Sequence, residues 1–170
     1  MAYESHQRAA EETKIAARCA VITLSDTRTQ ATDTSGRAIR DLLGGEGHQI
    51  VHTQIIPDEP LQLESLLTDL LARGDIDGIL TNGGTGISRR DQTISVIAKH
   101  LDEELPGFGE LFRMLSWEQI GSGAMLSRAI GGIAKGKLVF SMPGSTNAVE
   151  LAMEKLILPE IRHLLTELRK

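Results

Sequence analysis

The chain has little cysteine and few aromatic residues, and each shortage excludes a class of protein. Cys19 is the only cysteine among 170 residues, so no internal disulfide and no zinc site built on two thiolates is expected. Aromatic residues make up 3% of the chain, which leaves few rings on which single-stranded nucleic acid could stack. A single thiol is typical of the reducing cytoplasm, where we expect this protein.

Positive charge is also in short supply. Lys and Arg total 18 against 23 Asp and Glu, a net charge of −5, so we expect no nucleic-acid partner. No apolar run approaches the roughly 18 residues that a membrane-spanning helix needs, and we expect no membrane partner. The polar stretch at residues 1–14 does not resemble a secretory signal and is predicted to form a frayed arm or a short exposed helix.

Short apolar runs alternate with helical patterns along the rest of the chain. Strands are predicted at residues 19–24, 49–56, 78–81 and 138–142. Helices are predicted at about 34–45, 60–74, 92–102 and 109–120 and from residue 146 onward, where Pro159 should kink or divide the last one. This order predicts an α/β fold, a three-layer α/β/α sandwich with a mostly parallel sheet. It consists of one domain at 18–170 after an arm at 1–17.

Every predicted strand is followed by a loop of small residues, hydroxyls or acids. Ligands of such sheets bind beyond the carboxyl ends of the strands, so we expect these loops to meet at one edge. The Gly83–Gly86 loop allows a tight turn that brings N–H groups close to an anion, although such a turn alone is more often only a turn. Arg89, Arg90 and Arg128 could offset the charge of an anionic ligand.

Asp58 and Asp91 each precede a predicted helix, and two roles are open for them. Aspartate in this position can cap the free N–H groups of the helix, which stabilises it by about 1 kcal/mol. Alternatively, the two carboxylates can hold a magnesium ion bound to a polyphosphate, because Mg²⁺ binds one or two carboxylates together with phosphate oxygens. The spacing alone does not decide between these roles.

Three other patterns point to structure and not to chemistry. Residues 131–137 match the phosphate-binding pattern G-x-x-x-x-G-K, but Leu138 replaces the required Ser or Thr and a strand follows, so a β-turn is predicted. His48 and His52 are predicted to be exposed strand positions, too far apart to share a metal. Several large apolar residues are predicted to belong to the core or to a subunit interface: Phe112, Met114, Leu115 and Trp117.

Six short motifs follow one another along the chain: Thr32–Gly36, Pro57–Glu59, Thr81–Asp91, Pro106–Gly109, Leu126–Arg128 and Met142–Ser145. In this order they resemble the MoaB/MogA family of molybdenum cofactor biosynthesis proteins, which is related to the G domain of gephyrin. The resemblance runs from about Arg18 to Pro159. It implies a molybdopterin-binding fold assembled as a homotrimer or homohexamer. It also implies a reaction in which Mg-ATP adenylylates molybdopterin and releases pyrophosphate.

The resemblance further implies roles for particular residues. Asp58 and Asp91 match the family's catalytic acids, which would hold Mg²⁺, and the Gly83–Gly86 loop matches the cradle of pterin and phosphate. With ATP and molybdopterin as ligands, the residues implied to bind substrate are Ser25, Asp26, Asp33, Ser35, Gly36, Gly83, Gly84, Thr85, Gly86, Arg90, Ser127, Arg128, Pro143, Gly144 and Ser145.

Two other functions remain open from the sequence. A paralogue could bind or deliver the pterin in the same pathway without catalysis, and it would bind pterin tightly with no ATP-dependent turnover. An unrelated nucleotide-binding α/β domain would bind ATP with no preference for a pterin.

Overall fold

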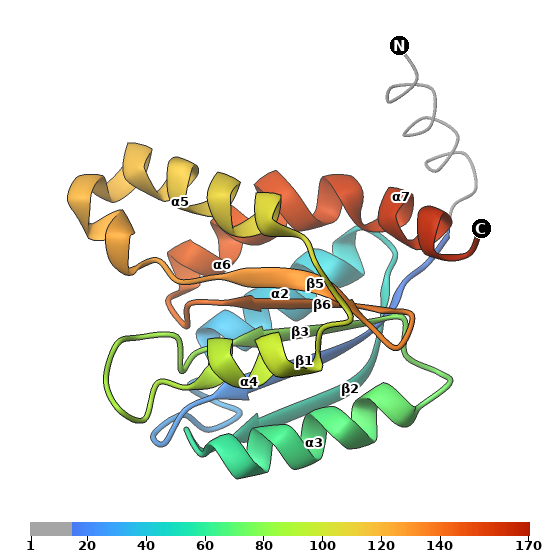
Figure 1. Ribbon diagram of the computed structural model, residues 1–170, viewed down its shortest axis with the longest axis horizontal. Helices are drawn as coiled ribbons and strands as arrows, with labels where there is room; N and C mark the ends of the chain where they lie inside the picture. Colours follow the sequence, from blue (N-terminus) through green and yellow to red (C-terminus); the bar gives the residue numbers. More distant parts are fainter. Residues whose placement is uncertain (1–14) are drawn as a thin grey trace.

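A single six-stranded sheet forms the centre of the molecule, with strand order β2-β1-β3-β6-β5-β4 (Figure 1). The computed structural model describes residues 15–170, so residues 1–14 of the arm predicted at 1–17 lie outside the described residues. Strands β2, β1, β3 and β6 are parallel, whereas β5 runs antiparallel to both β6 and β4. Helices cover both faces, so the predicted three-layer α/β/α architecture is confirmed.

The strands are β1 (Arg18–Leu24), β2 (Gln49–Ile56), β3 (Gly78–Asn82), β4 (Glu103–Glu104), β5 (Ile130–Ala134) and β6 (Lys137–Met142). The α-helices are α2 (Thr34–Gly45), α3 (Pro60–Ala72), α4 (Thr93–His100), α5 (Pro106–Ile120), α6 (Thr146–Ala152) and α7 (Leu158–Leu168). A 3₁₀ segment, η1 (Gly121–Leu126), follows α5, and a π-helical segment, η2 (Met153–Ile157), joins α6 to α7. Within the described residues, no helix is long and apolar enough to cross a membrane.

The sheet separates two apolar cores, because successive side chains of a strand point to opposite faces. Val21 of β1 packs in the core that includes Ile39 of α2 and Phe112 of α5. Its neighbour Ile22 packs in the other core, with Leu67 of α3. A strand buried on both faces is apolar along its whole length, which explains the continuous apolar run of β1.

Two strands, β4 and β5, were not predicted from the sequence. Two of the five residues of β5 are glycine, which weakens any strand pattern. The fold requires both of them, because a Cβ on Gly131 would lie 2.7 Å from Cδ1 of Phe140 and one on Gly132 would lie 2.4 Å from the carbonyl oxygen of Glu103. The β-turn predicted before Leu138 is confirmed: Lys135 and Gly136 both have positive φ and link β5 to β6.

The C-terminal helix is divided close to Pro159, as predicted. Pro159 lies at the start of α7, directly after the π-helical segment η2. Proline lacks an N–H group and its ring crowds the preceding turn, so the chain cannot continue as a regular α-helix through this point. The wider π-helical turn is one way in which a helix accommodates such a break.

The prediction that His48 is an exposed strand position is wrong. His48 precedes β2 and is only 5% exposed, and its Nδ1 accepts the backbone N–H of Ala17 at 3.0 Å. Burial lowers the pKa of His48, because the charged ring would lose its hydration. His52, four residues on, is half-buried on β2 and contacts Gln54 at 3.1 Å.

An ion-pair cluster ties both ends of the described chain to the sheet. Asp77 accepts hydrogen bonds from the backbone N–H and the guanidinium of Arg18 at 2.9 Å, and from Arg169 at 3.1 Å. These bonds, foremost those from Arg18, lower the pKa of Asp77 to about 2. The ionised carboxylate therefore stabilises the fold above its ordinary pKa of 3.8, and this stabilisation is lost as the pH falls toward 2.

Asp77→Asn is expected to lower the free energy of unfolding at neutral pH by about 1–2 kcal/mol, because the variant cannot form the ion pairs. Urea titrations at neutral pH and near pH 2 measure this effect. At the acidic pH about half of the native Asp77 carboxyls are protonated, so the difference between variant and native protein should shrink. An equal difference at both pH values would contradict the assignment.

Candidate functional site

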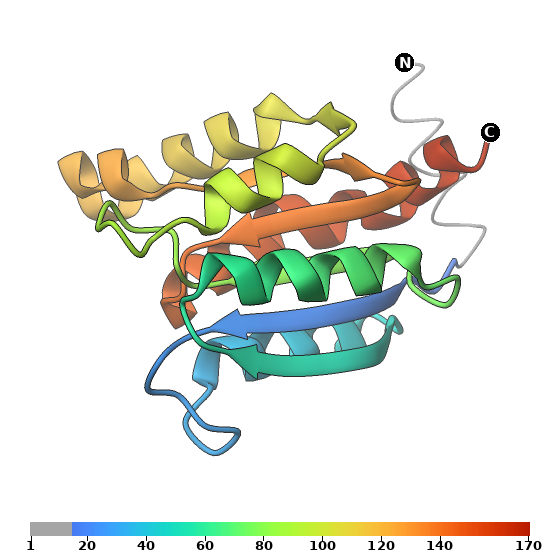
Figure 2. The same ribbon diagram turned by 60° about the horizontal axis from the view of Figure 1, so that its bottom comes forward.

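The parallel strands end on one side of the molecule, and the loops that follow them meet there (Figure 2). The loops after β1, β3 and β6 line a cavity of about 470 Å³. The loop after β2 adjoins it, because the backbone N–H of Asp58 donates to Oδ1 of Asp26 at 3.1 Å. The expectation that the four loops converge is therefore confirmed. The lining of the cavity is Leu24, Ser25, Thr27, Arg28, Gly83, Gly84, Thr85, Gly86, Asp91, Gly144 and Ser145.

The Gly83–Gly86 loop forms one wall of this cavity, which we call the phosphate-loop cavity. Gly83 and Gly84 have φ values of 98° and 63°, which other residues rarely adopt. A Cβ on Gly83 would lie 2.2 Å from the carbonyl oxygen of Leu24, and one on Gly84 would lie 2.2 Å from Oγ1 of Thr93. The N–H groups of Gly84 and Thr85 donate no hydrogen bond within residues 15–170, so they are available to an anion.

Asp58 lies beside this loop, and the structure does not use it as a helix cap. The N-cap of α3 is Glu59, and no side chain caps that helix. Oδ1 of Asp58 is buried and has no hydrogen-bond partner among the described residues. Burial, followed by repulsion from Asp26 and Asp91, raises the pKa of Asp58, while Arg90 opposes this shift. A buried carboxylate oxygen without a donor is suited to receive a cation.

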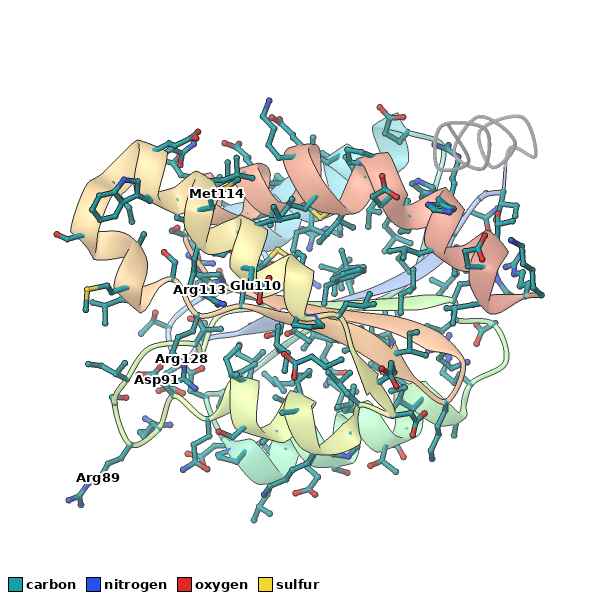
Figure 3. All side chains as sticks on the ribbon, turned by 45° about the horizontal axis from the view of Figure 1, so that its top comes forward. Arg89, Asp91, Glu110, Arg113, Met114 and Arg128 are labelled. Carbon is teal, nitrogen blue, oxygen red and sulfur yellow. The ribbon has the colours of Figure 1, made fainter. Side chains whose placement is uncertain are left out.

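Asp91 adjoins the same loop at Gly86 and is not a cap either, because Gln92 is the N-cap of α4 and makes no side-chain capping bond. Oδ2 of Asp91 accepts the backbone N–H of Ser88 at 2.9 Å. Hydrogen bonding by the Ser88 side chain is the main reason that the pKa of Asp91 is lowered, and the backbone N–H of Ser88 and the charge of Arg128 contribute. Figure 3 shows Arg128 close to Asp91 and Arg89 pointing away from the molecule.

The two aspartates fit the magnesium ion that the family resemblance implies. Ideal Cβ positions on Gly84 and Gly86 lie 2.8 Å from Oδ1 of Asp58 and 2.6 Å from Oδ2 of Asp91, so both carboxylates adjoin the loop. No group of three or more His, Cys, Asp or Glu side chains within residues 15–170 could hold a metal by itself. An ion here would need further oxygen ligands, as Mg²⁺ does when it binds with a nucleotide phosphate.

Arg90 and Arg128 bind protein groups at the rim of the site. Arg90 donates to Asp26 at 2.7 Å and to Glu59 at 2.9 Å, and it also reaches the carbonyl of Asp58. Arg128 donates to the carbonyl of Gly86 at 2.8 Å. Arg90 therefore balances the carboxylates around Asp58, while Arg128 fixes the glycine loop.

Asp33, Ser35 and Gly36 lie behind the cavity and support it. Asp33 is 1% exposed; it caps α2 through the N–H of Gly36 at 3.0 Å and accepts the hydroxyl of Thr23 at 2.9 Å. Ser35 is fully buried and donates to Oδ1 of Asn82 at 2.7 Å. These side chains hold the ends of β1 and β3 together, so their role in the fold is positioning.

A second, larger groove of about 690 Å³ adjoins the phosphate-loop cavity. It runs between α5 and α6, and Ser127, Pro143 and Ser145 line it. Ser145 lines both spaces and caps α6 by accepting the N–H of Ala148 at 3.3 Å. Ser25, at the other end of the cavity, accepts the N–H groups of Thr27 and Arg28. The sequence-predicted site residues thus fall into a cavity, a groove and a supporting layer.

Arg28 lines the phosphate-loop cavity but was missed by the sequence reasoning. Its guanidinium donates to Oγ of Ser35 and, at 2.7 Å, to the carbonyl of Gly144. The only local signal was a basic residue in the loop after β1, at an edge where ligands of such sheets bind.

The chain matches the family model described as "Probable molybdopterin binding domain" over residues 20–163. It is 51% identical over 171 residues to molybdenum cofactor biosynthesis protein B of Halalkalibacterium halodurans, a match that covers 100% of this chain and 99% of that protein. A solved structure of a molybdenum cofactor biosynthesis protein B is 50% identical with a TM-score of 0.89, covering 92% of this chain and 98% of that one. The tungsten cofactor synthesizing protein MoaB from Pyrococcus furiosus is 37% identical with a TM-score of 0.82, covering 91% and 98%. The resemblance seen in the six motifs is confirmed, and the chain belongs to the MoaB/MogA family of molybdenum cofactor biosynthesis proteins.

Proposed function

We propose that this protein adenylylates molybdopterin with Mg-ATP, giving adenylyl-molybdopterin and pyrophosphate. The observation that carries the proposal is the unpartnered, buried Oδ1 of Asp58 beside Gly84 of the glycine loop, with Asp91 beside Gly86 of the same loop. A carboxylate pair next to free N–H groups suits a nucleotide phosphate and its cation.

In the proposed reaction, a terminal phosphate oxygen of molybdopterin attacks the α-phosphorus of ATP. A new P–O bond forms, the bond between the α-phosphorus and the bridging oxygen breaks, and pyrophosphate leaves with the electron pair. Mg²⁺ held by Asp58 and Asp91 would neutralise charge on the phosphates. Because both reactants are anions, the tasks of the chain are alignment and charge balance, to which the N–H groups of Gly84 and Thr85 contribute.

The groove between α5 and α6 is the proposed binding site of the pterin ring. It has about 690 Å³ of space and contains both apolar side chains, such as Ile120 and Leu126, and polar ones, such as Gln119 and Asn147. This mixture suits a flat ring with polar edges. Because Ser145 lines both the groove and the phosphate-loop cavity, one molecule can place its ring in the groove and its phosphate in the cavity.

The proposal is tested by incubating the protein with Mg-ATP and molybdopterin and measuring pyrophosphate and the adenylylated pterin. Formation of both products supports the proposal. Tight binding of pterin without ATP-dependent turnover would instead support the non-catalytic binding or delivery role. Binding of ATP with no preference for a pterin would support neither.

Arg90 is expected to set the acidic limb of the pH profile. Its charge lowers the pKa of Asp58, so Arg90→Met raises that pKa further. If the ionised carboxylate is the active form, the pH at which kcat/KM falls should move upward in this variant. The matched control is Arg89→Met, since Arg89 is exposed and points away from the site. Identical profiles for the two variants would exclude this role of Arg90.

We further propose that the protein assembles as a homotrimer or homohexamer. Helix α5 presents large apolar side chains to the surface, including Met114 at 54% and Trp117 at 61% exposure. A single exposed apolar side chain is ordinary on a monomer, but several on one helix, here also Leu111 and Ile120, favour an interface. Sedimentation that shows only the 18.5 kDa species would exclude assembly.

A further inference from the structure

Arg28 occupies a position that its contacts with the protein do not fully explain. It follows β1, and its side chain is 27% exposed at the edge of the phosphate-loop cavity. A guanidinium has five N–H donors, and in Arg28 two of them form hydrogen bonds, to Ser35 and to Gly144. Within residues 15–170, the remaining three have no hydrogen-bond acceptor.

The guanidinium of Arg28 is also fixed in place before any ligand arrives. Asp33 lies 3.7 Å from its Nη1, and Asp33 is itself buried and held by Thr23 and the N–H of Gly36. The bond to the carbonyl of Gly144 joins it to the loop after β6. A cation held in this way loses little conformational entropy on binding an anion.

Arg40 provides an internal comparison. Its Nη1 lies 3.6 Å from the other oxygen of Asp33, and its side chain is 28% exposed, so its ion pair matches that of Arg28 in distance and exposure. However, Arg40 lines a separate cavity next to β2, with Thr53 and Gln54, and does not face the glycine loop. The two arginines therefore share one structural partner but face different spaces.

We propose that Arg28 is the cation that binds the substrate's phosphate in the phosphate-loop cavity, while Arg90 balances the carboxylates around Asp58. The inference rests on the proposed function, since it assigns the phosphate contact of that same site. Arg28 is suited to this contact because a guanidinium can donate two parallel hydrogen bonds to a phosphate. Together with the N–H groups of Gly84 and Thr85, it surrounds the space on two sides.

The test compares Arg28→Met with Arg40→Met in calorimetric titrations with magnesium pyrophosphate, with Mg-ATP and with molybdopterin. Arg28→Met is expected to raise the dissociation constant of at least one phosphate ligand by roughly 10- to 100-fold, the range for lost hydrogen bonds to a charged group. Arg40→Met should bind as the native protein does. Both variants remove one ion pair to Asp33, but Arg28→Met also removes the hydrogen bonds to Ser35 and Gly144, so it should lose more stability in urea than Arg40→Met.

Comparison of the three ligands identifies which phosphate Arg28 binds. A loss confined to molybdopterin assigns its phosphate, and a loss for pyrophosphate and ATP assigns the nucleotide. Equal effects of the two variants, or no binding of any phosphate ligand by the native protein, would overturn the assignment. If Arg28→Met alone weakens binding but the native protein forms no adenylylated pterin, the proposed function fails while the role of Arg28 stands.

Discussion

Asp58→Asn and Asp91→Asn are each expected to lower the rate of adenylylation by roughly 1000-fold or more, because the substitution removes the charge that would hold the cation. The variants should stay folded. Ionised Asp58 has a raised pKa in the fold, so its charge opposes folding above the ordinary pKa, and Asp58→Asn should be at least as stable as the native protein at neutral pH. Pyrophosphate release and urea unfolding measure the two effects separately.

A matched control for this prediction is Asp69→Asn on α3, whose side chain is exposed. It changes the net charge by the same amount at a residue that does not line the cavity, and it should leave turnover unchanged. Asp91→Asn should cost some stability, because the hydrogen bond that Asp91 accepts from Ser88 is weakened. Normal turnover in both Asp58→Asn and Asp91→Asn would exclude the proposed roles of the two carboxylates.

Gly83→Ala is expected to destabilise the protein by about 3–5 kcal/mol and to distort the cavity. The added Cβ would lie 2.2 Å from the carbonyl oxygen of Leu24, a backbone atom that cannot move without disturbing the end of β1. The φ of 98° adds strain for any residue with a side chain. Thermal unfolding followed by circular dichroism should show a midpoint lower by about 10 °C.

The control for Gly83→Ala is Gly44→Ala. Gly44 lies in α2 with no atom within 4 Å of its ideal Cβ position, so alanine should stabilise the helix by about 0.5–1 kcal/mol. Opposite signs for the two variants are the expected result. If Gly83→Ala unfolds at the same temperature as the native protein, the inference that the loop packs tightly against β1 is excluded.

The elements found from the sequence are those whose pattern depends on neighbours along the chain. The apolar run of β1 predicts a strand buried on both faces, and Asp33 before α2 predicts the cap that the structure contains. Strand β5 was missed because its glycines make room for parts of the two adjacent strands, Gly131 for Phe140 and Gly132 for the Glu103 carbonyl, which no local pattern reveals. His48 was also misplaced, since it is buried and accepts the backbone N–H of Ala17, which precedes it by 31 residues in the chain.

The sequence by itself determined the order of strands and helices, the glycine loop and the six motifs of the family, because these features lie in short continuous segments. Only the tertiary structure decided which charges meet. Arg90 binds the carboxylates of Asp26 and Glu59, whereas Arg28 faces the glycine loop. Likewise, the raised pKa of Asp58 depends first on burial and then on acids from two other loops. Burial and Coulomb interactions depend on distances in space, and only folding sets those distances between residues far apart in the chain.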